Sequence, residues 1–193
     1  MLEEIDTRQV ILQAAEELFM RYGYTSVSMR RLVEEIAKHR RITKPAIYYH
    51  FADKEALYVA VLLDVTARSG QQLRAAAAKA GDLRVRLVAL ARVLAQLDPE
   101  ALTRMQLDIA QHVGSAARAE LYHAFQRDIR GPILAVFDDA ANGGVLRADR
   151  SSALAAAAFF GLVSSIVARP GQEWQDNAAE LAVDVLLEGV ARA

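Results

Sequence analysis

Apolar residues recur at intervals of three and four along most of this chain. The clearest run, between residues 6 and 22, comprises Ile11, Ala14, Ala15, Leu18, Phe19 and Tyr22. This spacing places apolar side chains on one face of a helix, and no stretch of useful length has the alternation of a strand. The 193 residues are 53% hydrophobic, with only 4 Pro and 10 Gly. The sequence therefore predicts an all-α fold of about nine helices.

Helix boundaries follow from caps, glycines and prolines. Gly23 is expected to end the first helix, and Gly131 with Pro132 is expected to kink the seventh. The last helix is expected to begin near Trp174. The expected helices cover residues 6–22, 28–37, 43–50, 54–78, 82–97, 98–113, 115–140, 151–169 and 174–190.

The stretch Ile42–Leu57 contains an unusual short helix. Thr43 is a good N-cap, and Pro45 fits the first turn, where its missing N–H costs nothing. Ile47 and Phe51 lie four residues apart and should be buried together. The remaining faces carry Lys44, Ala46, Tyr48, Tyr49 and His50. A short helix with exposed basic and aromatic groups suits the major groove of DNA, although the two tyrosines could equally be core aromatics.

The charge is unevenly distributed. The chain has a net charge of −1, but residues 28–54 contain seven basic side chains against three acidic ones. A local basic patch can bind phosphate even on a nearly neutral protein.

Several classes of site are not expected. The chain has no Cys, which excludes disulfides and thiolate chemistry and is consistent with a cytoplasmic protein. His112 and His123 have no third ligand at a suitable spacing, so no metal is expected. No cofactor, catalytic motif, signal sequence or membrane span is expected either, so the sequence does not indicate an enzyme.

Three motifs in order, at Thr7–Tyr24, Ser26–Leu32 and Ile42–Leu57, resemble the N-terminal DNA-binding domain of the TetR (tetracycline repressor) family of bacterial transcription regulators. The resemblance covers roughly the first 60 residues. It implies a helix-turn-helix domain over residues 1–53 and an effector-binding and dimerisation domain over residues 54–193. The second region resembles the family only in length and helix content.

The resemblance also implies DNA contacts. Phosphate would be held by Ser28, Tyr48, His50 and Lys54. Arg30 and Lys44 would reach guanine, and Ala46 or Pro45 would pack on a thymine methyl group. Thr43 and Tyr49 complete the set. The connection before Ile42 is about four residues longer than is usual in the family, roughly one helical turn. It predicts either a longer second helix or a basic loop, in which Arg40 and Arg41 add phosphate contacts or are merely solvated.

The family further implies a homodimer paired through its last two helices, which reads a palindromic operator. The expected dimer residues, some of which must be core, are Phe159, Phe160, Leu162, Val163, Ile166, Leu181, Val185 and Leu186. A small-molecule effector is expected to contact Met105, Ile109, His112, Tyr122, Phe125 and Phe137, each of which could instead be plain core. The sequence thus predicts a double-stranded DNA-binding repressor released by an apolar effector. Alternatives are a regulator controlled by a protein partner or by no ligand, and a helical enzyme or binding protein that does not bind DNA.

Overall fold

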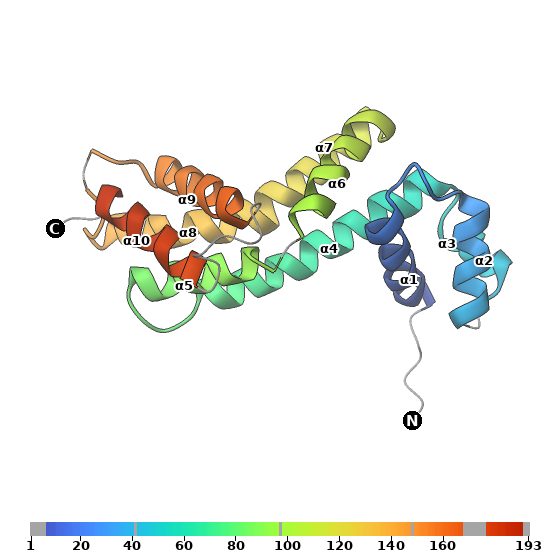
Figure 1. Cartoon of the computed structure of the whole chain (residues 1–193), viewed down its shortest axis with the longest axis horizontal. Coiled ribbons are helices and arrows are strands. Elements are labelled where there is room, and N and C mark those ends of the chain that lie inside the picture. Colours follow the sequence, from blue (N-terminus) through green and yellow to red (C-terminus); the bar gives the residue numbers. More distant parts are fainter. Residues whose placement is uncertain (1–6, 41, 97, 148, 168–176, 191–193) are drawn as a thin grey trace, which may run out of the picture. The chain divides into compact units, whose positions relative to one another are not determined.

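The computed structural model describes residues 7–40, 42–96, 98–147, 149–167 and 177–190. Every secondary-structure element within these ranges is a helix, which confirms the predicted all-α class (Figure 1). The helices are α1 (Thr7–Tyr22), α2 (Met29–Arg40), α3 (Lys44–His50), α4 (Lys54–Ala77), α5 (Leu83–Leu94), α6 (Pro99–His112), α7 (Ser115–Phe125), a π turn (Gln126–Arg130), α8 (Gly131–Asn142), α9 (Ser152–Val167) and α10 (Ala178–Val190).

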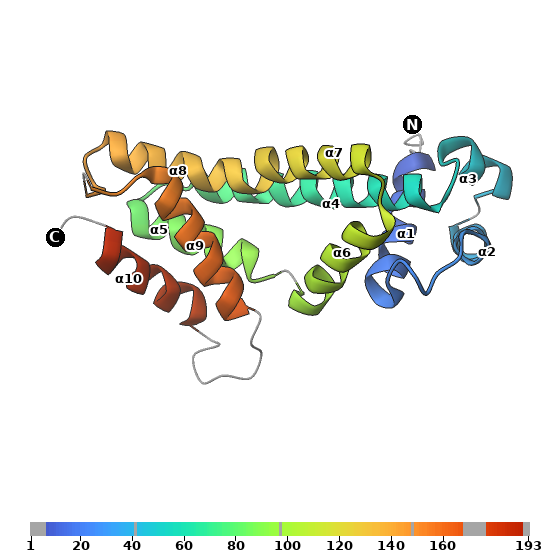
Figure 2. The ribbon, with the colours of Figure 1, turned by 90° about the horizontal axis from the view of Figure 1, so that it is seen from above.

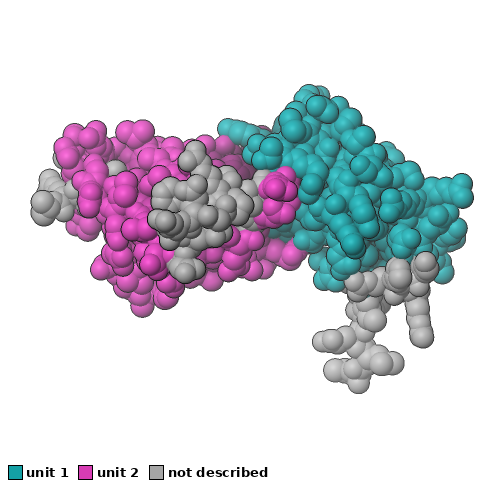
Figure 3. Space-filling model, viewed as in Figure 1, with its two compact units in different colours: residues 1–65, 103–122 teal, residues 66–102, 123–193 magenta. Residues whose placement is uncertain are grey.

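The chain forms two compact units (Figure 3). The first contains residues 1–65 and 103–122. In it α1, α2 and α3 pack against one another, and their shared core includes Phe19, Leu32, Ile47 and Phe51, all buried as predicted. The first half of α4 adds Leu57 to the same core.

The second unit contains residues 66–102 and 123–193. In it α10 packs against α5 and α9, and α8 packs against α9 and α5 (Figure 2). Two ion pairs, Arg84 with Asp184 at 2.7 Å and Arg92 with Glu180, join α5 to α10. The core of this unit is centred on Phe137 and Phe159, whose rings meet edge to face with centroids 6.1 Å apart.

The compact units divide within α4, after residue 65. The boundary expected between residues 53 and 54 divides a DNA-binding region from an effector-binding and dimerisation region. It is a boundary between functions and not between packing units, and it stays a prediction. The compact division lies later because Leu57, Tyr58 and Val61 of α4 are buried in the first core.

One helix prediction differs from the structure, and another falls on residues that the structure does not describe. The long helix expected over residues 115–140 is interrupted by the π turn, and α8 begins at Gly131 with Pro132 in its first turn. The start expected at Trp174 lies outside the described residues, and α10 begins at Ala178. None of the described helices combines the length and the apolar character needed to cross a bilayer.

Candidate DNA-binding surface

The ends of α3 are fixed by local hydrogen bonds. The Thr43 hydroxyl accepts from the Ala46 N–H at 3.3 Å, which confirms the predicted cap. At the other end, the Phe51 N–H donates to the Ile47 carbonyl at 2.9 Å. Ile47 is completely buried and Phe51 is nearly so. These two side chains seat the helix on the first core and determine which face remains outside.

The outward face of α3 carries the predicted DNA-contacting side chains. Tyr48 is 50% exposed and Tyr49 is 86% exposed. Thr43, Lys44 and Pro45 are also exposed, whereas Ala46 and His50 are half-buried. The Tyr49 and His50 rings meet edge to face, with ring centroids 5.3 Å apart. Such an exposed tyrosine contributes little to folding and is accessible to a ligand.

The start of α2 presents two further predicted residues. The Ser28 hydroxyl accepts from the Arg31 N–H at 3.2 Å. Arg30 donates to Glu34 at 3.0 Å, and its side chain is 87% exposed. Of the two alternatives for the longer connection, the structure shows the helical one, because α2 continues to Arg40. The Arg40 side chain and all of Arg41 lie outside the described residues.

Lys54 has partners within the protein. Its ammonium donates to the Tyr24 carbonyl at 3.1 Å and lies 3.9 Å from the centre of the Tyr24 ring. Burial lowers the pKa of Lys54, and the carboxylate of Asp108 opposes this shift. The expected phosphate contact of Lys54 stays a prediction. To make it, the ammonium would donate through an N–H other than the one that bonds to the Tyr24 carbonyl.

Three side chains of α6 hold the end of α1 and the turn between α1 and α2, an arrangement missed from the sequence. Arg104 donates to the Met20 carbonyl at 2.8 Å, and Asp108 accepts from the Tyr24 N–H at 3.0 Å. His112 shares a 3.2 Å hydrogen bond with the Thr25 hydroxyl. Because residues 104, 108 and 112 are four apart, they line one helix face. This four-residue spacing was the signal in the sequence that could have predicted a polar contact face on α6.

Gly23 allows this close approach. Its φ is +76°, a conformation that favours glycine, and a Cβ there would lie 3.1 Å from Cδ of Arg104. The predicted helix end at Gly23 is therefore confirmed, and α6 packs directly over it.

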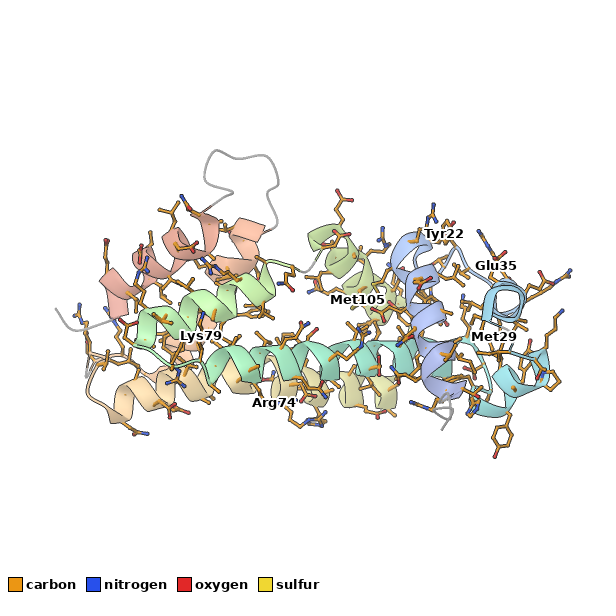
Figure 4. All side chains as sticks on the ribbon, turned by 90° about the horizontal axis from the view of Figure 1, so that it is seen from below. Tyr22, Met29, Glu35, Arg74, Lys79 and Met105 are labelled. Atoms are coloured by element: carbon orange, nitrogen blue, oxygen red, sulfur yellow. The ribbon has the colours of Figure 1, made fainter. Side chains whose placement is uncertain are left out.

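The six predicted effector residues lie in both units. In the first, Met105 (Figure 4) and Ile109 pack against the core, Tyr122 is 59% exposed, and His112 stacks on Tyr24. In the second, Phe137 is fully buried, and Phe125 meets Phe160 edge to face with centroids 5.8 Å apart. Their effector role stays a prediction.

The predicted dimer residues fall into three groups. Phe159, Val163 and Leu186 are buried in the core of their own unit, whereas Leu181 and Val185 are 47% and 63% exposed. The half-buried group is Phe160, Leu162 and Ile166. An apolar groove of about 430 Å³ lies between α9 and α10 and is lined by Leu162, Ser165, Ile166, Ala178, Leu181, Ala182 and Val185.

Comparison with known proteins assigns the N-terminal region. Residues 11–61 match the family described as bacterial regulatory proteins, tetR family. Over 67 residues the chain is 37% identical to the HTH-type transcriptional repressor AcnR of Corynebacterium efficiens, which covers 35% of this chain and 34% of that protein. The matched segment thus spans about a third of that relative's length.

Similarity to solved structures extends over the whole chain. E. coli NemR in its reduced form has a TM-score of 0.77 at 19% identity, covering 96% of this chain and 98% of that one. SmeT, the repressor of the Stenotrophomonas maltophilia multidrug efflux pump SmeDEF, has a TM-score of 0.69 at 20% identity, covering 97% and 92%. At these identities the likeness establishes the fold alone. Residues 11–61 are therefore assigned by sequence to the tetR family of bacterial regulatory proteins, and the whole chain shares the fold of these solved structures.

Proposed function

We propose that this protein is a transcriptional repressor, not an enzyme, that acts in the cytoplasm. It binds a palindromic operator as a homodimer and is released by a small, largely apolar effector. The observation that carries the proposal is the capped helix α3, seated by buried Ile47 and carrying Tyr49 on its exposed face.

The chemistry of α3 and the start of α2 suits a DNA duplex. The major groove admits one helix, and Lys44 can donate to the guanine acceptors there. Exposed Pro45 offers apolar contact to a thymine methyl group. The ion pair of Arg30 with Glu34 is exposed to solvent and contributes little to stability, so Arg30 can exchange it for a DNA partner.

A second copy of the chain is the proposed occupant of the groove between α9 and α10. Leu181 and Val185 stand exposed beside it, although large apolar side chains are usually buried. Dimerisation would cover them. It would also supply two recognition helices, which a palindrome with half-sites one DNA turn apart requires.

The effector part of the proposal rests on linkage between two sites. SmeT has been solved in complex with triclosan. We extend to this chain only the idea that its effector is an apolar small molecule. A ligand that favours the DNA-incompetent state by about 1.4 kcal/mol weakens operator binding tenfold.

The test is selection of bound sequences from a random duplex library, followed by sequencing. The full chain should enrich one palindrome, and Tyr49→Ala should fail to enrich it. Tyr122→Ala is the matched control, because Tyr122 is another exposed tyrosine. Enrichment of no sequence by the unaltered chain, or of the same palindrome by Tyr49→Ala, would reject the assigned recognition helix.

A further inference from the structure

A cavity of about 180 Å³ in the second unit shares only Phe160 with the sites described above. It lies between α9 and the helical segment formed by the π turn and α8. None of the six predicted effector residues lines it. Its lining consists of Gln126, Arg130, Gly131, Ile133, Leu134, Ala153, Ala156 and Phe160.

The walls of the cavity are apolar. Ile133 and Ala156 are buried, and Leu134 and Phe160 are half-buried. On α9 the lining residues follow a spacing of three and four, so they share one helix face. The small side chains at residues 131, 153 and 156 leave the space open. A well-characterised apolar protein cavity of about 150 Å³ binds benzene, so this volume suits a single aromatic ring or a short alkyl chain.

The polar part of the lining is cationic. Arg130 is exposed and has no carboxylate partner among the residues that the structure describes. Seven other arginines in the described part of this unit behave differently: Arg74, Arg84, Arg86, Arg92, Arg127, Arg147 and Arg150 each pair with an Asp or Glu. A guanidinium presents two parallel N–H donors that match a carboxylate. The Gln126 amide adds a neutral donor to the same lining.

The π turn holds these two polar side chains at its ends. Its middle is anchored by Asp128, a buried carboxylate that accepts from Arg74 at 3.0 Å and from Arg127 at 2.6 Å (Figure 4 labels Arg74). Single π turns within α-helices are frequent at functional sites. Here the anchored turn keeps Gln126 and Arg130 on a fixed support.

We propose that this cavity binds small carboxylic acids with an apolar body about the size of one ring. The ring lies among Ile133, Leu134 and Phe160, and the carboxylate pairs with Arg130. As an effector site the cavity rests on the proposed function and deepens it, because it names the chemical class of the effector. The binding reaction itself involves no DNA and is tested without it.

The test uses the full chain and two probes, benzoate and its uncharged analogue benzamide. Equilibrium dialysis should show that benzoate binds more tightly than benzamide. Arg130→Ala should weaken benzoate about tenfold or more and leave benzamide nearly unchanged, because one charge-assisted contact is lost. Ala153→Leu should weaken both probes by filling the cavity, at an exposed position of α9 where leucine is a good helix former. Arg150→Ala, an exposed arginine outside the lining, should change neither.

Three results would overturn the proposal. The unaltered chain could show no preference for benzoate at millimolar concentration. Arg130→Ala could bind benzoate as well as the unaltered chain does. Arg130→Ala or Ala153→Leu could change the oligomeric mass with no effect on benzoate, which would assign this face to a second copy of the chain. Each result is independent of the library selection, so failure here leaves the DNA-binding proposal intact.

Discussion

The contact between Asp108 and the α1–α2 turn gives a quantitative prediction. The variant Asp108→Ala removes the carboxylate that accepts from the Tyr24 N–H at 3.0 Å. A hydrogen bond to a charged group contributes about 1.5–3 kcal/mol. Because this contact is only partly buried, water can replace the lost acceptor, and we expect the lower value, about 1.5 kcal/mol. For a chain of this length, that lowers the melting temperature by about 3–6 °C.

Two measurements check this prediction. Urea denaturation should give the loss in unfolding free energy, and hydrogen exchange at the Tyr24 amide should accelerate roughly tenfold. Asp108→Asn retains an oxygen acceptor and should lose less stability. Leu107→Ala changes the neighbouring residue, which is 57% exposed, and should stay within about 0.5 kcal/mol of the unaltered chain. If Asp108→Ala matched Leu107→Ala in both measurements, α6 would not hold this turn as described.

Three further predictions concern the second unit. Gly70→Ala places a Cβ 2.7 Å from Asp128 Cβ and 2.9 Å from the Asp128 carbonyl oxygen. This overpacking costs about 1–3 kcal/mol, which should exceed the roughly 1 kcal/mol gained from the higher helix propensity of alanine. The urea midpoint of unfolding should therefore fall. Hydrogen bonds from Arg127 and then Arg74 lower the pKa of Asp128 below its ordinary 3.8, so this carboxylate stabilises the fold at neutral pH. The stability advantage over Asp128→Asn should therefore shrink as the pH falls below 3.8 through the folded pKa, and an advantage independent of pH would refute this. Val185→Glu should yield a monomer in analytical ultracentrifugation and weaken operator binding; an unchanged dimer would exclude the groove between α9 and α10 as the interface.

Local signals in the sequence were sufficient to place α3 and the end of α1. Thr43 and Pro45 determine where α3 begins, and the four-residue spacing of Ile47 and Phe51 identifies its buried face. Gly23 marks the end of α1 through its positive φ. Each signal acts within one or two turns of the residue that carries it, so no tertiary information was needed.

The features missed from the sequence depend on residues far apart in the chain. The π turn packs against Gly70, more than 50 residues earlier, and its carboxylate pairs with Arg74. Neither contact can be seen in the periodicity of residues 115–140, which predicts one continuous helix with a kink. In the same way, the contacts of the Lys54 ammonium with the Tyr24 carbonyl and ring join residues far apart in the sequence, and the expected phosphate contact of Lys54 stays a prediction.

The central claim, that α3 reads DNA, is tested most directly by operator affinity across a salt series with the selected palindrome. We compare Lys44→Ala/Tyr49→Ala with the matched double variant Lys79→Ala/Tyr122→Ala, whose residues are exposed and are not part of α3. Loss of a base contact costs about 1–3 kcal/mol. The first variant should therefore lose on the order of 100-fold in specific affinity and bind all sequences alike, and the second should stay within about threefold. Equal affinity of the two variants for the palindrome at every salt concentration would contradict the account.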